Sequence, residues 1–287
     1  MSEKAVIAGA GPAGLTCAIY LAQAGWQVDV FSGEEQSVSC LAEAPDVRNY
    51  PGFPTGISGF DLLEKFIEQA EKSGAVIHPE AIVAIDTGAK TVIDSTGNVM
   101  GYDEVVMASG VKPREFTCDG IENIPVHTCA VCDGGMYGKT DNVVVIGGGD
   151  TAVNSALYLS GIVGKVYVIV RKDYLRATNW NAVNKLASKP NVDIWYKSNV
   201  VSVSKETCAQ RFGEVQFSHD MHWIRMDTGD ECGASAIFSC IGYDVNEIPV
   251  VGDGNVRRCG DCVEKHHQVA VAVGSGAKVA LDILGRS

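Results

Sequence analysis

The sequence has no excess of basic residues and no long hydrophobic run. Its 23 lysine and arginine residues stand against 35 aspartate and glutamate residues, which leaves a net charge of −12. A nucleic-acid-binding protein needs a basic surface to neutralise phosphates, so this balance argues against that class of partner. No apolar run approaches the roughly 20 residues that cross a bilayer, so we expect no membrane span.

An export signal is also missing. The chain passes from Met1 into the apolar segment Ala5–Ala8 without a basic region, a long apolar stretch and a cleavage site in that order, so we expect a cytoplasmic protein. Ten cysteines at scattered spacings then indicate mostly reduced thiols, with catalysis or metal binding as exceptions. Four of them are interpreted as small buried hydrophobic residues: Cys17, Cys208, Cys232 and Cys240.

Glycine is abundant, and two glycine-rich segments stand at equivalent places in a repeated pattern. A strand over Lys4–Ala8 leads into Gly9–Gly14 and then into a helix. A strand over Asn142–Ile146 likewise leads into Gly147–Ala152 and a second helix. With 287 residues and 32 glycines, the chain is expected to form two domains. Two further strands complete the βαβ units, over Gln27–Phe31 and Lys165–Val170.

Hydrophobic periodicity predicts the other elements. Residues 59–73 form an amphipathic helix with Leu62, Phe66 and Ala70 on one face, and a last helix covers about His267–Leu284. The fold class is therefore α/β, with two Rossmann-like dinucleotide-binding domains. Short strands are expected at 82–86, 90–93, 104–108, Val192–Tyr196, Met221–Met226 and Ser235–Cys240.

The first glycine turn has the pattern of a dinucleotide site. Such a site needs glycine for a tight turn, glycine where backbone approaches the pyrophosphate, and a small residue where helix packs on strand, and Gly9, Gly11 and Gly14 meet these needs. A helix that starts at Pro12 aims its free N–H groups at the phosphates. The alternative is a tight turn in another α/β fold. The pattern recurs at Gly147, Gly149 and Ala152.

Cationic residues follow the second βαβ unit. An NAD site carries an acid after its second strand, whereas this chain has Arg171 and Lys172, with Arg176 following. Cationic side chains suit a 2′-phosphate, so the segment favours NADPH over NADH. The alternative is a solvated basic patch, because Asp173 stands among these charges.

A pair of cysteines, Cys129 and Cys132, lies ahead of the second glycine turn. Two cysteines at this spacing can close a small disulfide ring, and a thiolate of lowered pKa can attack another disulfide. Asp133 follows directly, and its carboxyl can exchange a proton with a leaving thiolate. The alternative is half of a zinc site completed by Cys259 and Cys262, although the gap between the pairs far exceeds zinc-ribbon spacing.

Taken in order, these features resemble the low-molecular-weight, bacterial-type thioredoxin reductase family across nearly the whole chain. Asp46–Pro54 is similar to its flavin-side loop, and Ala108–Gly110 to its short crossover motif. Gly260 and Asp261, with Gln268, resemble its C-terminal flavin motif.

The resemblance implies a discontinuous architecture. Residues 1–114 and 244–287 would form an FAD-binding domain, and residues 115–243 an inserted NADPH-type domain that carries the redox pair. Hinges near 113–115 and 244–248 would let one domain rotate against the other.

The resemblance also implies the roles of residues and partners. Cys132 would lie beside the flavin, Cys129 would attack the disulfide of thioredoxin or a similar small dithiol protein, and Asp133 would be the general acid. The family also implies a homodimer. The residues expected to bind FAD are Gly9, Gly11, Pro12, Ala13, Gly14, Glu34, Cys40, Asn49, Gly260, Asp261, Gln268 and Val269. Those expected to bind NADPH are Gly147, Gly149, Asp150, Thr151, Ala152, Arg171, Lys172 and Arg176.

The chain departs from the family pattern at several places. Val170 and Lys172 replace the usual histidine and second arginine, and Val38–Cys40 replaces a Gly-Gly-Gln flavin loop. The segment from Gly242 to Gly260 is shorter than is usual in the family, and Asn255–Cys259 replaces the apolar run that normally leads to the C-terminal flavin motif. These changes resemble a divergent branch that takes electrons from ferredoxin or has lost nicotinamide binding.

Three functions follow. The leading hypothesis is electron transfer from NADPH through FAD and the Cys129–Cys132 pair to thioredoxin. The second keeps the flavin and the disulfide but takes electrons from ferredoxin, or runs in reverse as a dithiol oxidase. A remote alternative is a zinc-stabilised binding protein that uses both CxxC pairs. Cys259 and Cys262 are either a second redox pair or packing residues.

Overall fold

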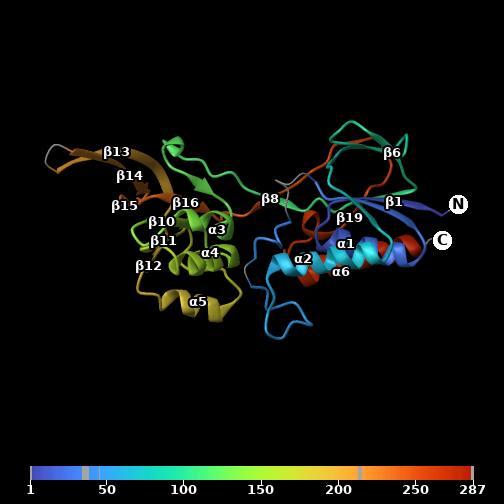
Figure 1. Ribbon diagram of the computed structural model, residues 1–287, viewed down its shortest axis with the longest axis horizontal. Helices are drawn as coiled ribbons and strands as arrows, with labels where there is room; N and C mark the ends of the chain where they lie inside the picture. The colour runs from blue at the N-terminus through green and yellow to red at the C-terminus, as the bar shows by residue number, and fades with distance from the viewer. Residues whose placement is uncertain (1, 34–38, 45, 213–214, 286–287) are drawn as a thin grey trace. The chain divides into compact units, whose positions relative to one another are not determined.

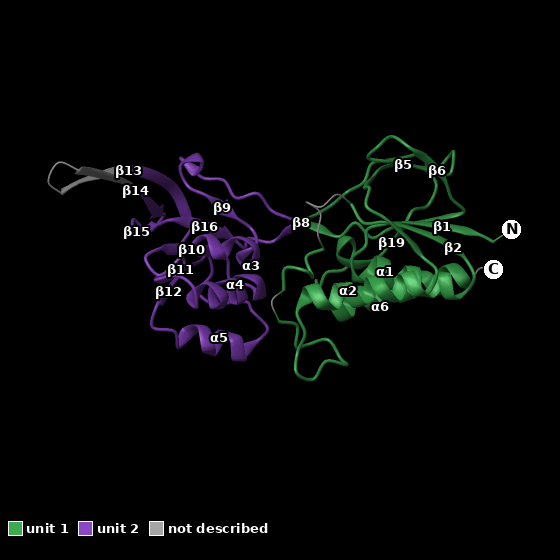
Figure 2. Cartoon of the chain, in the orientation of Figure 1, with its two compact units in different colours: residues 1–112, 244–287 green, residues 113–243 purple. Residues whose placement is uncertain are grey.

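The computed structural model describes residues 2–33, 39–44, 46–212 and 215–285. The chain divides into two compact units, coloured separately in Figure 2: Met1–Lys112 with Asp244–Ser287 form unit 1, and Pro113–Tyr243 form unit 2. The resemblance predicts an inserted domain over 115–243, whereas unit 2 begins at Pro113 and ends at Tyr243. The cofactor expected for each unit stays a prediction.

The main sheet of unit 1 has five parallel strands in the order β19-β7-β1-β2-β3. Helix α1 (Pro12–Gln23) connects β1 to β2 and packs against α2 (Gly59–Lys72) and α6 (Val269–Leu284), the helices labelled in Figure 1. Because β19 and α6 come from the C-terminal part of the chain, both ends of the sequence build this unit. The strands are β1 (Lys4–Ala8), β2 (Gln27–Phe31), β3 (Val76–His78), β7 (Glu104–Met107) and β19 (Arg257–Arg258).

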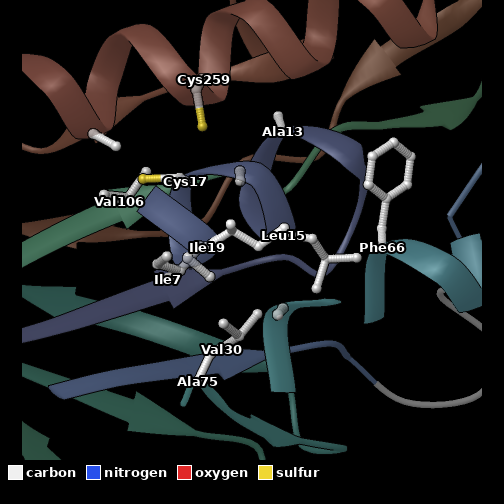
Figure 3. Close-up of a cluster of buried hydrophobic side chains, with 14 of the residues drawn as sticks. Ile7, Ala13, Leu15, Cys17, Ile19, Val30, Phe66, Ala75, Val106 and Cys259 are labelled. Atoms are coloured by element: carbon white, nitrogen blue, oxygen red, sulfur yellow. The ribbon is translucent and has the colours of Figure 1, made fainter. Parts of the chain in front are cut away.

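Strand β1 is buried on both faces. Ala5 and Ile7 belong to the core between the sheet and α1, which Figure 3 shows. Val6 and Ala8 belong to a second core, with side chains from a small sheet of order β18-β4-β5-β6. A strand enclosed on both faces needs apolar residues without alternation, which explains its uniform sequence. The small sheet comprises β18 (Val250–Val251), β4 (Ile82–Asp86), β5 (Thr91–Asp94) and β6 (Val99–Gly101).

Unit 2 repeats this design. Its main sheet has the order β12-β11-β10-β16-β9 and is parallel throughout. The strands are β9 (Val126–His127), β10 (Asn142–Ile146), β11 (Lys165–Val170), β12 (Val192–Tyr196) and β16 (Ala236–Ser239). The helices are α3 (Ala130–Asp133), α4 (Asp150–Ser160) and α5 (Trp180–Ala187).

The central strand β10 of unit 2 also separates two cores. Val143 and Val145 pack with residues of α4, whereas Val144 and Ile146 pack with residues of an antiparallel sheet on the other face. That sheet consists of β13 (Val200–Phe212), β14 (Val215–Met226) and β15 (Glu231–Ala234). A strand that is covered on both faces therefore precedes each of the two glycine-rich turns.

The chain passes between the units at β8 (Val111–Pro113) and β17 (Tyr243–Val245), which pair with each other. On the side of unit 2, the Arg114 N–H donates to the Gly242 carbonyl at 2.9 Å. On the side of unit 1, the Asn246 N–H donates to the Gly110 carbonyl at 3.0 Å. Each unit is thus closed by its own backbone hydrogen bond.

Most of the predicted elements are confirmed, with shifts of one or two residues at some ends. The main difference is β14, which begins at Val215 rather than at Met221 and forms a long hairpin with β13. No helix among the described residues is long and apolar enough to cross a membrane. The part of the chain that the structure describes also contains three 3₁₀ turns: η2 (Ile121–Asn123), η3 (Gly134–Met136) and η4 (Gly260–Cys262).

Candidate active site

The first glycine turn joins β1 to α1. Gly9 has a φ of +121°, and a Cβ at this position would lie 2.1 Å from the Ala108 carbonyl oxygen. A Cβ on Gly14 would lie 1.9 Å from the Gly9 oxygen, so both positions require glycine. Gly11 caps α1 without a side-chain hydrogen bond to the helix, and Pro12 follows at the first position. The early N–H groups of α1 therefore form a donor set that suits a pyrophosphate.

The C-terminal part of the chain packs on the start of α1. Gly260 has a φ of +76°, and a Cβ there would lie 2.7 Å from the Ala13 Cβ. Gly276 of α6 approaches so closely that its Cβ would lie 2.1 Å from the Ala13 oxygen. The predicted FAD residues Ala13 and Gly260 therefore come together, with Val269 at the start of α6.

Asp261 carries a buried oxygen without a protein partner in the described structure. Its Oδ1 atom is buried and accepts no hydrogen bond from the protein. Burial raises the pKa of Asp261, while the charge of His267 lowers it. A buried acceptor without a donor is costly unless a ligand supplies one. The Asp261 oxygen therefore fits a cofactor that carries hydroxyl groups, and FAD is such a cofactor.

Two expected flavin-side residues meet directly. The Asn49 amide Nδ2 donates to Gln268 Oε1 at 2.8 Å, which links two distant parts of unit 1. Cys40 lies near the Val111 carbonyl, with 3.8 Å between sulfur and oxygen, and burial raises the pKa of its thiol to about 11. Glu34 and Val38 lie outside the described residues.

The second glycine turn joins β10 to α4. Gly147 has a φ of +143°, and a Cβ there would lie 2.3 Å from the Cys240 carbonyl oxygen. Ala152 is buried one turn into α4, 3.2 Å from the place of that Cβ. A Cβ on Gly149 would meet no atom within 4 Å. Gly149 therefore leaves open space where a phosphate can approach the backbone.

The basic segment after β11, residues 171–176, and the residues that follow it form hydrogen bonds with the second glycine turn and the start of α4. The Arg176 N–H donates to the Gly148 carbonyl at 2.5 Å. The Asp150 carboxylate accepts from the Thr178 N–H at 2.8 Å, the Thr178 hydroxyl at 2.9 Å and the Asn179 N–H at 3.3 Å. Asp150 thus holds the segment in place, while its expected contact with NADPH stays a prediction. The side chains of Arg171, Lys172 and Arg176 are exposed, as is Thr151.

Cys129 and Cys132 form a disulfide with a Cα–Cα distance of 5.4 Å. Cys129 caps the short helix α3, and its sulfur accepts from the Cys132 N–H at 3.1 Å. Cys129 is buried and Cys132 is exposed. An N–H bond to sulfur stabilises negative charge there, so the reduced Cys129 is suited to be a nucleophilic thiolate.

Asp133 joins a hydrogen-bonded group that the sequence did not reveal. Its Oδ2 atom lies 3.0 Å from His127 Nδ1, and His127 Nε2 lies 2.7 Å from the Tyr137 hydroxyl. His127 stands two residues before Cys129, but no periodicity marked it as functional. Its position depends on the pairing of β9 with β16.

The other cysteines behave as packing residues where they are described. Cys17 and Cys232 are buried as expected, Cys240 is half-buried, and the side chain of Cys208 lies outside the described part. Cys259 and Cys262 are buried free thiols in unit 1. No group of three or more metal-ligating side chains occurs among the described residues.

Comparison with known proteins identifies the family. The family described as pyridine nucleotide-disulphide oxidoreductase matches residues 3–257. A thioredoxin reductase of Spironucleus barkhanus is 34% identical, with 96% of each chain covered. The chain belongs to the thioredoxin reductases of this family. An Arabidopsis thaliana relative named NADPH-dependent thioredoxin reductase 3 is 34% identical over 85% of this chain and 46% of its own length.

A solved thioredoxin reductase confirms the fold. The enzyme from Lactococcus lactis superposes with a TM-score of 0.81 at 23% identity, covering 99% of this chain and 98% of its own. The expected family and fold class are therefore confirmed, and thioredoxin reductases of this kind use FAD and NADPH. Membership in a family of flavoenzymes, with Cys129 and Cys132 in a disulfide, removes the basis for the zinc-protein alternative.

Proposed function

We propose that the chain passes electrons from NADPH through FAD to the Cys129–Cys132 disulfide, and from there to the disulfide of thioredoxin or a similar small dithiol protein. The observation that carries this proposal is a disulfide at the start of a short helix, with the Asp133 carboxyl in the same turn. The two glycine turns and the thioredoxin reductase relatives support it.

The residues of unit 1 fit FAD. The N–H groups at the start of α1 would hold its pyrophosphate, and Asp261 Oδ1 would accept from one of its hydroxyl groups. The linked pair of Asn49 and Gln268 would lie on its flavin side. When bound, FAD supplies two-electron chemistry that connects a nicotinamide to a disulfide.

The thioredoxin half of the reaction uses the chain's own residues. The Cys129 thiolate attacks one sulfur of the partner disulfide, so that a mixed disulfide forms and the partner S–S bond breaks. The first departing thiolate takes a proton from Asp133. Cys132 then gives its thiol proton to Asp133 and attacks the Cys129 sulfur, which restores the disulfide and releases the second partner thiolate. Two electrons leave the enzyme, and Asp133 ends protonated as it began.

An anaerobic titration with NADPH tests the donor. The absorbance of the bound flavin should fall as NADPH is added, and two thiols should then become reactive at Cys129 and Cys132. An unchanged spectrum with NADPH, together with bleaching by reduced ferredoxin, would overturn the donor assignment.

A second candidate keeps the flavin and the disulfide but takes electrons from ferredoxin, or runs as a dithiol oxidase. One observation favours it: Val170 lies against the second glycine turn, where a Cβ on Gly148 would be 2.9 Å from Val170 Cγ1. An apolar side chain at this place offers the 2′-phosphate no hydrogen-bond donor.

We also propose that the protein is a cytoplasmic homodimer. The resemblance to thioredoxin reductases supports the dimer. Seven free cysteines among the described residues support a reducing compartment. Sedimentation of the FAD-loaded protein tests the dimer, because a single species of monomer mass over the micromolar range would contradict it.

A further inference from the structure

His127 contacts the carboxyl group that the proposed exchange reaction uses. Its Nδ1 atom lies 3.0 Å from Asp133 Oδ2, and its Nε2 atom lies 2.7 Å from the Tyr137 hydroxyl. The side chain of His127 is 14% exposed and that of Asp133 is 30% exposed, so the contact is screened from water more than a surface pair is.

The imidazole of His127 is held by packing as well as by hydrogen bonds. His127 and Phe238 are register partners on β9 and β16, and their rings stack at a centroid distance of 5.0 Å. The Tyr137 ring meets both of them edge-on, at 5.7 Å from His127 and 6.0 Å from Phe238. Three mutually packed rings therefore fix the direction in which Nδ1 points.

The hydrogen bonds also select one tautomer. If the Tyr137 hydroxyl donates to Nε2, then Nδ1 carries the hydrogen and donates to Asp133 Oδ2. Burial raises the pKa of Tyr137, and the nearby charges of Asp133 and Asp141 raise it further. Tyr137 thus keeps its hydrogen and can donate it to Nε2, while the carboxylate form of Asp133 can only accept, so Nδ1 of the neutral imidazole carries the hydrogen. Among the described residues, the titratable groups that face His127 are Asp133 and Tyr137, while Phe238 is apolar.

We propose that His127 is a positioning residue for Asp133: its Nδ1–H holds Oδ2, which directs Oδ1 to exchange protons with sulfur. This inference rests on the proposed function. The hydrogen bond to Oδ2 is retained whether Oδ1 is protonated or not, so the carboxyl keeps its direction through both exchange steps. Tyr137 contributes by holding His127 in the required tautomer.

The test isolates the exchange half of the reaction. The FAD-loaded enzyme is reduced anaerobically with dithionite and mixed with oxidised thioredoxin, and partner thiol release is followed over pH 5 to 9. Dithionite makes the result independent of the nicotinamide. We expect His127→Phe to slow exchange by about 10- to 100-fold. We also expect the shape of its pH profile to change, because a carboxyl group that is no longer held in one direction takes a smaller part in the proton exchange.

Matched variants separate positioning from packing. His127→Asn places an amide N–H near the position of Nδ1, so it should restore the exchange rate to within about threefold and restore the profile. Tyr137→Phe keeps the ring packing and should cause a smaller loss with a shifted profile. His222→Phe changes a histidine on β14 of the same unit and should leave exchange unchanged.

A double variant decides whether His127 acts through Asp133. In an Asp133→Asn background, His127→Phe should cause no further loss. The proposal is overturned if the two losses multiply, or if His127→Phe exchanges at the wild-type rate. If His127→Phe does not fold, Tyr137→Phe with a wild-type profile overturns it.

Failure of the proposed function would look different. A reduced wild-type enzyme that leaves thioredoxin oxidised would contradict the partner but not the role of His127. The same variants would then be compared with a small aromatic disulfide as acceptor, where the same order of rates is expected.

Discussion

At the residue scale, Asp261 offers a test of the proposed binding of FAD. Its buried Oδ1 has no protein donor, so removing it should weaken FAD binding rather than the fold. We expect Asp261→Ala to reduce FAD affinity by about 10- to 100-fold, which is the loss of one hydrogen bond to a charged group. Fluorescence titration of the apoprotein with FAD measures this. Asp261→Asn keeps an acceptor and is the matched control, and equal affinity in all three proteins would contradict the assignment.

The raised pKa of Asp261 also predicts how the stability of the apoprotein changes with pH. The folded apoprotein binds the proton of the Asp261 carboxyl more tightly than the unfolded chain does. The stability that this proton contributes is therefore present below the ordinary carboxyl pKa of about 3.9, and it is lost as pH rises through the raised pKa of the folded state. At pH values above the raised pKa, apo Asp261→Asn should therefore be more stable to heat than the wild-type apoprotein.

The second CxxC pair provides another prediction at this scale. Burial raises the pKa of Cys17 to about 12 and raises the pKa of Cys259 and Cys262. Figure 3 shows the Cys259 side chain directed towards α1, which carries Cys17. Cys17 therefore remains almost entirely in its unreactive thiol form at pH 8.

Alkylation of the reduced native protein at pH 8, followed by mass spectrometry, should therefore modify Cys132 and Cys129 and leave Cys17, Cys259 and Cys262 intact. Denaturation before alkylation is the control, since all three should then react. Protection of Cys259 and Cys262 even after denaturation would reveal a disulfide and revive the second redox pair.

At the element scale, the second glycine turn contains one glycine that the fold requires, Gly147, and one that leaves space for a ligand, Gly149. Gly147→Ala puts a Cβ against the Cys240 carbonyl at a positive φ, so it should destabilise unit 2 by about 1–3 kcal/mol. Gly149→Ala meets no neighbour and should leave stability unchanged. Its methyl group would instead occupy the approach of the pyrophosphate, so the KM for NADPH should rise by about tenfold.

Thermal unfolding and flavin reduction by NADPH measure the two effects. If Gly149→Ala reduces NADPH use no more than a surface substitution does, the second turn does not bind the nucleotide. That outcome would favour the ferredoxin-linked candidate.

Elements with local signals were predicted well from the sequence, and those defined by distant pairing were not. The turns at Gly9 and Gly147 follow directly from strand, glycine and helix patterns. His127 lies on a two-residue strand whose role comes from pairing with Phe238, far along the chain. The motif assigns Asp150 to cofactor binding, but its carboxylate accepts a hydrogen bond from Thr178. This contact depends on where the chain after β11 lies relative to the second glycine turn, which no local pattern indicates.

At the scale of the whole molecule, two separate cores predict two unfolding transitions. Each unit has its own sheet, enclosed by its own hydrophobic clusters. A ligand that binds only the folded state stabilises the unit that holds it. We expect calorimetry to show FAD raising one transition and NADP⁺ raising the other. Gly149→Ala, the matched control, should reduce only the second shift, and one transition that responds to both ligands would contradict the expectation.

The hydrogen bonds from Arg114 to Gly242 and from Asn246 to Gly110 have a consequence for evolution. Because the two ends of Pro113–Tyr243 are neighbours, this segment can be removed or exchanged as a cassette without cutting any strand of the five-stranded sheet in the host unit. If unit 1 binds FAD as proposed, selection can therefore alter the electron donor or the protein acceptor through changes in this segment alone, while the sequence of unit 1 is inherited unchanged.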